Sequence, residues 1–380
     1  MSTTEKTSYV NMIAGILLAL AVTIVGIYGA KILGYLLMKM NILPDGSSSP
    51  ISGIFVAILI GIVIRNFIGL HTIFHEGIAF TLKYALRAGI ILLGLRLSLA
   101  EALKLGAWGL PLIVISITCG LFITIYFTRK LKESTRLGML IATGTGICGV
   151  TAIMAVSPVL KAKDNEISYA VANITIFGLV GMLFYPYLAN LFFASDPVKT
   201  GLFLGTAIHD TAQVTGAALI YSDIYGIEEV VNVATVTKLT RNLFIIVVIP
   251  LISILSYRLT EQKAVHHQET PKWYTLVPLF VIGFLVMSLV RTIGDFTVET
   301  SSLAFGFLEA TSWQTFYESL SSFGSTYMLG MAMASVGLLT DFSAFKNIGI
   351  RPFYIGFIAA VSVGIVSIVL VSLFGQFVSV

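Results

Sequence analysis

Uninterrupted runs of apolar residues alternate with short polar segments along almost the whole chain. A helix rises about 1.5 Å per residue, so a run of about 20 residues matches the roughly 30 Å hydrocarbon core of a bilayer. The pattern therefore predicts an all-α polytopic membrane protein with about eleven transmembrane helices. The predicted spans are 10–30, 51–70, 84–100, 106–128, 137–160, 167–193, 200–221, 230–256, 273–291, 323–340 and 352–377.

The composition indicates the same class of protein. Of the 380 residues, 57% are hydrophobic and 11% are charged, with a mean hydropathy of +0.94, whereas soluble domains carry about 25% charged residues. A transmembrane barrel would alternate apolar and polar positions, and the apolar runs here are continuous. The net charge of +4 indicates no nucleic-acid partner. The expected partners are the lipid bilayer and a small solute, and a homodimer stays open.

The distribution of basic residues predicts the orientation in the membrane. With a cytoplasmic N-terminus, the inside segments hold fourteen Lys and Arg residues and the outside segments seven, in agreement with the positive-inside rule. The run at 10–30 is interpreted as a span, because it is long for a signal peptide and lacks a clean cleavage pattern. We predict a single transmembrane domain over 1–380, with a cytoplasmic loop at 259–272 and an extracytoplasmic loop at 294–322.

The motifs of several other classes are missing from the sequence. Cys119 and Cys148 lie far apart in apolar segments, which argues against a disulfide framework or a zinc site. There is no G-x-x-x-x-G-K-[ST] motif, so we expect no ATP-driven pumping by this chain alone. We also expect no cofactor and no metal. The chain also lacks G-x-S-x-G and H-E-x-x-H, so we expect no enzyme. An intramembrane enzyme is kept as an alternative, for which no nucleophile–base spacing is evident.

Four ionisable residues fall near the middle of two predicted spans. His209 and Asp210 lie about 14–15 Å from the inner end of the span at 200–221. Lys238 and Arg241 lie about 12–16 Å from the outer end of the next span. The two spans are antiparallel neighbours, so all four side chains are predicted at one level near the middle of the bilayer. A charge there costs roughly 2.5–3.5 kcal/mol, so the group predicts a paired, water-accessible site.

A glycine-rich segment within the span at 137–160 predicts a broken helix. Its three glycines fall within six residues, and each costs about 1 kcal/mol relative to alanine in a helix. A break at this depth lines a cavity or lies inside protein, and its free N–H groups suit an anion. His209 and Asp210 are predicted to couple protons. The predicted substrate-binding residues are Thr143, Gly144, Thr145, Gly146, Cys148, Gly149, Thr151, Gln213, Lys238 and Arg241.

The span at 200–221 is predicted as one helix with a polar face, because its small and polar positions recur at i, i+4, i+8 and i+11. Two structural interpretations stay open beside the functional one. In the first, Asp210 forms a salt bridge with Lys238 or Arg241 that only fixes helix packing. In the second, the glycines only allow close helix crossing. The recurring positions are Gly205, His209, Gln213 and Gly216.

Several blocks of the sequence resemble one known family. They are GTGICGVTAIMAVSPVLKAK (144–163), GLFLGTAIHDTAQVTGAALI (201–220) and ATVTKLTRNLFIIVVIP (234–250), with LRAGIILLGLRLSL (86–99) upstream. They look like the signature blocks of the YeiH family of bacterial inner-membrane proteins, to which sulfate export is assigned by name. The resemblance runs from about residue 50 to the end. Some relatives have Glu where this chain has Asp210, so the carboxylate is retained.

The resemblance implies a multi-pass protein of the bacterial inner (plasma) membrane. It also implies an inverted-repeat secondary-transporter fold with broken helices, by distant similarity to bile-acid-symporter-type and cation/proton-antiporter-type folds. The predicted function is secondary transport of a small anion, such as sulfate, sulfite or a related sulfonate or carboxylate, with proton coupling. The alternative is a cation/proton antiporter that uses Asp210, against which the two nearby cations count.

Overall fold

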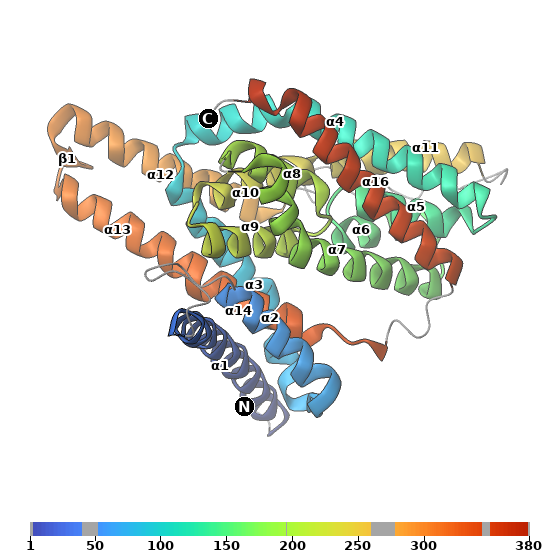
Figure 1. Ribbon diagram of the computed structural model, residues 1–380, viewed down its shortest axis with the longest axis horizontal. Coiled ribbons are helices and arrows are strands. Elements are labelled where there is room, and N and C mark those ends of the chain that lie inside the picture. Colours follow the sequence, from blue (N-terminus) through green and yellow to red (C-terminus); the bar gives the residue numbers. More distant parts are fainter. Residues whose placement is uncertain (1–2, 40–51, 195, 260–277, 344–349, 379–380) are drawn as a thin grey trace. The chain divides into compact units, whose positions relative to one another are not determined.

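The computed structural model describes residues 3–39, 52–194, 196–259, 278–343 and 350–378, and almost all of them are helical (Figure 1). Eight helices in these ranges are long and apolar enough to cross a membrane. The predicted class, an all-α polytopic membrane protein, is confirmed. The eight helices are Val10–Leu36, Thr72–Arg96, Leu99–Lys130, Asn165–Phe193, Glu229–Ile252, Leu279–Ser301, Ala310–Leu339 and Ile350–Phe377.

The other three predicted spans coincide with shorter or interrupted helices. The span at 51–70 corresponds to α2 (Gly53–Val63) followed by a π-helical turn, η1 (Ile64–Gly69). The spans at 137–160 and 200–221 are each divided into two helices. The number of eleven spans therefore stays a prediction, as do the orientation and the cytoplasmic loop at 259–272, of which residues 260–272 lie outside the described residues.

The chain divides into two compact units, where the sequence predicted a single domain. The first unit comprises Met1–Leu103, Ala218–Asn232 and Leu279–Phe342. The second comprises Lys104–Ala217, Val233–Pro278 and Ser343–Val380. Three helices, α4, α9 and α10, each contribute residues to both units.

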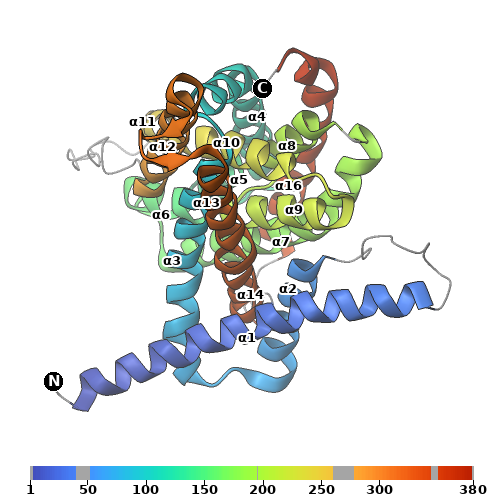
Figure 2. The ribbon, with the colours of Figure 1, turned by 90° about the vertical axis from the view of Figure 1, so that its left-hand side faces the viewer.

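The first unit is held together by close helix crossings. The α1 helix crosses α2 and α14, and α14 also packs on α3 (Figure 2). The crossing of α1 and α3 is so tight that a Cβ on Gly77 would lie 2.1 Å from the Met12 carbonyl oxygen. Small residues allow such approach of two backbones. Besides α2 and η1, the elements are α1 (Thr3–Lys39), η2 (Thr72–Phe74), α3 (His75–Leu93), η3 (Gly94–Arg96), α12 (Leu279–Ser301), β1 (Leu303–Ala304), β2 (Leu308–Glu309), α13 (Ala310–Phe323), η5 (Gly324–Leu329) and α14 (Gly330–Leu339).

The predicted loop at 294–322 is mostly helical, which corrects that expectation. The α12 helix continues to Ser301, and a two-stranded antiparallel hairpin connects it to α13. Polar side chains stabilise these helix ends, because the Asp295 carboxylate accepts hydrogen bonds from Arg291 Nε at 2.5 Å and from Trp313 Nε1 at 3.0 Å. Hydropathy alone did not predict these helices, because their polar residues lower the mean hydropathy of the segment even where they are hydrogen-bonded.

The second unit has one apolar core. Buried side chains of α4, α5, α6, α7, α11 and α16 form it, and α16 also packs on α8. Figure 1 shows α8, α9 and α10 grouped beside α5 and α6. The elements are α4 (Leu99–Lys130), α5 (Thr135–Gly146), α6 (Val150–Leu160), α7 (Asp164–Phe193), α8 (Pro197–Ala207), α9 (Thr211–Tyr225), α10 (Glu229–Leu243), α11 (Ile245–Leu259), α16 (Ile350–Phe374) and η6 (Gly375–Phe377).

Two breaks interrupt helices in the second unit. The first break is the predicted one and lies at 147–149, between α5 and α6. Gly149 adopts φ +67° and ψ −128° there, a conformation open to glycine but strained for other residues. The second break, at 208–210 between α8 and α9, was not predicted. Gly205 and Gly216 consequently lie on different helices, and the predicted continuous polar face is wrong.

The sequence does contain a signal for the second break. Asp210 and Gln213 have the spacing of an N-cap residue and its N3 partner, which marks the start of a helix. The Asp210 Oδ1 atom accepts a hydrogen bond from the Ala212 N–H at 2.9 Å, as an N-cap side chain does. The capping signal was overlooked because the small and polar residues at 205, 209, 213 and 216 recur with the period of one continuous helix.

We predict that Gly149→Ala destabilises the protein by roughly 2–4 kcal/mol, because the new side chain adopts a strained backbone conformation. Its Cβ would also lie 3.0 Å from Asp210 Oδ2. The matched control is Gly226→Ala, where φ is +72° and nothing lies within 4 Å of a Cβ. Thermal unfolding of the purified protein should show the larger loss for Gly149→Ala, and equal losses would contradict the account.

Candidate functional site

The C-terminal end of α5 depends on a side chain from another helix. The last four carbonyls of a helix have no partner within it. Here the Thr143 carbonyl accepts from the Ile147 N–H at 3.1 Å and the Gly144 carbonyl from the Gly149 N–H at 3.0 Å. The next two carbonyls, of Thr145 and Gly146, point at Arg241. The break therefore turns the backbone so that half of these groups face α10.

Arg241 joins the ends of two interrupted helices. Its Nη2 donates to the Thr145 carbonyl at 2.6 Å and its Nε to the Gly146 carbonyl at 2.9 Å, both at the end of α5. Its Nη1 donates to the carbonyls of Thr206 at 2.7 Å and Ile208 at 3.2 Å, at the end of α8. The planar guanidinium suits this arrangement, because its five N–H donors have fixed directions.

Lys238 makes the same connection one helical turn earlier on α10. Its Nζ donates to the Ile147 carbonyl at 2.7 Å, in the first break. It also donates to the carbonyls of Ile208, at 3.1 Å, and His209, in the second break. Lys238 and Arg241 are both 0% exposed. Two buried cations thus offset two helix C-termini, each of which carries about half a negative charge.

The opposite poles of the interrupted helices meet at Asp210. This residue caps α9 and lies beside Gly149, the residue from which α6 begins. The N-cap residue of α6 is Gly149, which has no side chain to cap this helix. Helix N-termini carry about half a positive charge each and present free N–H groups. One carboxylate therefore faces the positive ends of two helices.

This positive side of the site is the accessible one. Asp210 and Thr211 are half-buried and Thr151 is exposed, whereas Lys238 and Arg241 are enclosed. The Thr211 hydroxyl accepts a hydrogen bond from Asn242 Nδ2 at 3.1 Å, and the buried Asn242 Oδ1 has no partner among the described residues. Thr211 and Asn242 were not among the site residues that the sequence predicted. Each of these polar residues directly follows a predicted site residue, Asp210 or Arg241, and this adjacency was the signal that could have identified them.

Other predicted site residues have structural surroundings. Thr143 donates to the Met139 carbonyl of its own helix, and a Cβ on Gly144 would lie 2.0 Å from Ile174 Cδ1. Gln213 is buried against α7, where its Nε2 donates to the Thr175 carbonyl at 3.3 Å. Cys148 is buried in the apolar core.

The structure separates the open interpretations of the charged residues. Within the described part of the chain, Asp210 forms no ion pair with Lys238 or Arg241. The cations bind backbone carbonyls, and the carboxylate binds a helix N-terminus. His209 is buried, and its Nδ1 has no hydrogen-bond partner among the described residues. Nor do the described residues contain a group of three His, Cys, Asp or Glu that could hold a metal ion.

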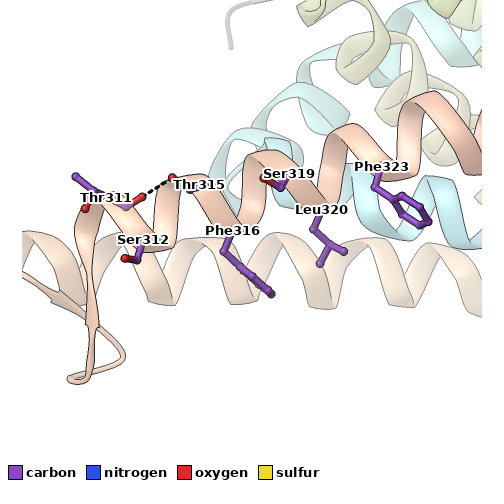
Figure 3. A pocket seen from close by; sticks show the side chains of 7 residues that line it. All are labelled: Thr311, Ser312, Thr315, Phe316, Ser319, Leu320 and Phe323. Atoms are coloured by element: carbon purple, nitrogen blue, oxygen red, sulfur yellow. Dashed lines mark hydrogen bonds between the residues drawn. The ribbon is translucent and has the colours of Figure 1, made fainter.

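A shallow groove of about 650 Å³ lies elsewhere, along α13 (Figure 3). Hydroxyl and apolar side chains line it, including Thr315, Ser319, Phe316 and Phe323, and none of its lining residues is charged. The groove therefore offers no compensation for an ionic ligand, unlike the interrupted helices.

Comparison with known proteins identifies the family. Residues 14–356 match the family model described as conserved hypothetical protein 698. A UPF0324 membrane protein of Streptococcus agalactiae is 32% identical over 92% of this chain and 99% of its own length. Another, from Clostridium tetani, is 30% identical over 86% of this chain and 90% of its own. The chain belongs to this family of membrane proteins, and the predicted membership is confirmed.

A structural comparison gives a more distant similarity. The sodium proton antiporter from Methanocaldococcus jannaschii matches over 94% of this chain and 99% of its own, with 11% sequence identity and a TM-score of 0.26.

The geometry changes the expected result of replacing Lys238. The Lys238→Met change would leave the buried carbonyls of Ile147 and His209 without their donor, each at a cost of about 1–3 kcal/mol. The Ile208 carbonyl would keep its hydrogen bond from Arg241. We therefore predict a loss of at least about 2 kcal/mol of stability, an effect that a residue serving only to bind the substrate would not have.

The measurement is the fraction of detergent-solubilised protein that stays monodisperse after heating. The control is Lys104→Met, which removes an exposed lysine from α4. If Lys238→Met melts at the same temperature as the control, Lys238 does not support the helix ends.

Proposed function

We propose that this protein is a secondary transporter of a small anion, such as sulfate, sulfite or a related sulfonate or carboxylate, coupled to protons through Asp210. The observation that carries the proposal is the meeting of two interrupted helices, with cations at both C-termini and one carboxylate at both N-termini. Non-helical backbone at membrane depth is a feature of transporter binding sites.

The charges at the site favour an anion. The partial charges of the four helix ends cancel, because the two C-termini carry about half a negative charge each and the two N-termini about half a positive charge each. What remains is two cations, Lys238 and Arg241, and one carboxylate, Asp210. Protonation of Asp210 would leave two uncompensated positive charges beside the N-terminus of α6, where the N-cap residue is a glycine. An anion at that N-terminus would find backbone N–H groups, as in other anion sites at helix ends.

Lys238 and Arg241 receive a different role from the one that the sequence predicted. Their donors are engaged by seven backbone carbonyls, so they do not need the anion as a partner. They act at a distance, by making the region positive and by fixing both breaks. The hydroxyls of Thr151 and Thr211, on the accessible side, are better placed to contact the solute.

Coupling follows from competition for the same donors. The ionised Asp210 carboxylate already occupies the N-terminus of α9, and its charge opposes an arriving anion. Protonation removes that charge, so a proton and an anion each raise the affinity for the other by the same factor. Asp210 is half-buried and open to solvent protons, whereas His209 is enclosed. We therefore assign the coupling proton to Asp210 and a positioning role to His209.

One observation favours a second candidate, a cation/proton antiporter. Asp210 is a carboxylate at the accessible side of a break, and carboxylates bind hard cations. The adjacent helix N-termini and the two cations oppose such binding. Uptake of sulfate, methanesulfonate or Na⁺ into proteoliposomes, with and without a pH gradient, distinguishes the two candidates.

We predict that the anion affinity of the wild-type protein rises as pH falls from about 8 to 5.5. The rise approaches tenfold per pH unit where one proton is fully linked to binding. Asp210→Asn, which mimics the protonated acid, should bind well at pH 8 and lose most of this dependence. His209→Gln should retain the slope.

Binding of the preferred anion to protein in detergent, titrated at several pH values, provides the measurement. An affinity independent of pH in the wild type, or a full slope in Asp210→Asn, would rule out coupling at this carboxylate.

A further inference from the structure

A second cavity, of about 380 Å³, lies within the first unit. It is lined by residues of α1, the start of α2, η3, the end of α9, the turn before α10, and the end of α13 with η5. Unlike the groove on α13, it contains charged residues of both signs. These are Lys31, Arg96, Asp223 and Glu228.

Arg96 is a fixed cation in this cavity. Its side chain is 12% exposed, and its Nη2 donates to the Ser325 hydroxyl at 3.1 Å. Ser325 belongs to η5, a π-helical turn between α13 and α14. Such turns are rare and occur often at functional sites. The guanidinium is thus held at Nη2 by Ser325, and Arg96 lines the cavity.

The partner of Arg96 is held much less firmly. Arg96 Nη1 lies 2.9 Å from Glu228 Oε2, but the Glu228 side chain is 71% exposed. Glu228 lies in the short turn between α9 and α10, two residues after Gly226, where nothing lies within 4 Å of an added Cβ. An ion pair with one exposed partner contributes little to stability. Glu228 can therefore leave Arg96 at low cost.

The remaining carboxylate is already compensated. Asp223 Oδ2 accepts a hydrogen bond from the Ser52 hydroxyl at 2.7 Å, and Ser52 caps the N-terminus of α2. The positive end of α2 therefore offsets Asp223. With Glu228 displaced, Arg96 and Lys31 leave the cavity positive, and the hydroxyls of Ser322 and Thr326 add donors.

We propose that this cavity is a second anion site, which binds a small oxyanion between Arg96 and the surrounding hydroxyls when Glu228 moves away. The guanidinium fork matches two oxygens of a sulfate, sulfonate or carboxylate group. Chloride, which has no such pair of oxygens, should bind more weakly. The site is independent of transport and of Asp210.

Site-specific chemical labelling tests this proposal. Phenylglyoxal modifies accessible guanidinium groups, and peptide mass spectrometry reports the labelling rate of Arg96 in the full-length protein in detergent. We expect methanesulfonate to slow the labelling of Arg96 several-fold, and chloride at equal ionic strength to slow it less. Equal protection by the two anions, or none, overturns the proposal.

The variant Glu228→Gln tests the displacement directly. Without the competing carboxylate, Arg96 should be labelled faster, and the methanesulfonate concentration for half protection should fall about two- to fivefold. Glu229→Gln is the matched control, because it removes the same charge one residue further on and does not line the cavity. Identical half-protection in both variants, or an Arg96 that stays unlabelled in Glu228→Gln, contradicts the proposal.

Discussion

Two helices are interrupted in the apolar interior of this protein, and their free backbone ends must be compensated there. Lys238 and Arg241 do this from one helix, α10, by donating to carbonyls of both breaks. Without water, each unsatisfied carbonyl costs about 1–3 kcal/mol, and two unpaired cations would cost more. The breaks and the cations therefore require each other, and neither is stable alone.

This arrangement separates the poles of the site. The negative helix ends and the cations are enclosed, while the positive helix ends and Asp210 lie on the accessible side. Backbone N–H groups, the hydroxyls of Thr151 and Thr211 and the Asp210 carboxylate lie on that side, which is where we propose that the solute binds. The cavity in the first unit has a similar arrangement, because the enclosed cation Arg96 is paired there with the exposed carboxylate of Glu228.

The sequence predicted the helical membrane class, the family and the first break, because long apolar runs and clustered glycines have direct physical consequences. It also predicted that His209 and Asp210 lie close to Lys238 and Arg241, because the two pairs have similar predicted depths in neighbouring spans. It did not predict the partners of the cations. Backbone carbonyls leave no signal in side-chain chemistry, and Asp210 looked like a salt-bridge partner until the second break showed it to be a helix cap.

The central claim is that an anion and a proton are linked through Asp210. The most direct measurement is the number of protons taken up per anion bound, from calorimetric titrations near pH 7 in two buffers of different ionisation enthalpy. The account predicts an uptake of up to about one proton per anion in the wild type and none in Asp210→Asn. Anion binding without proton uptake in the wild type, or with the same uptake in Asp210→Asn, would contradict it.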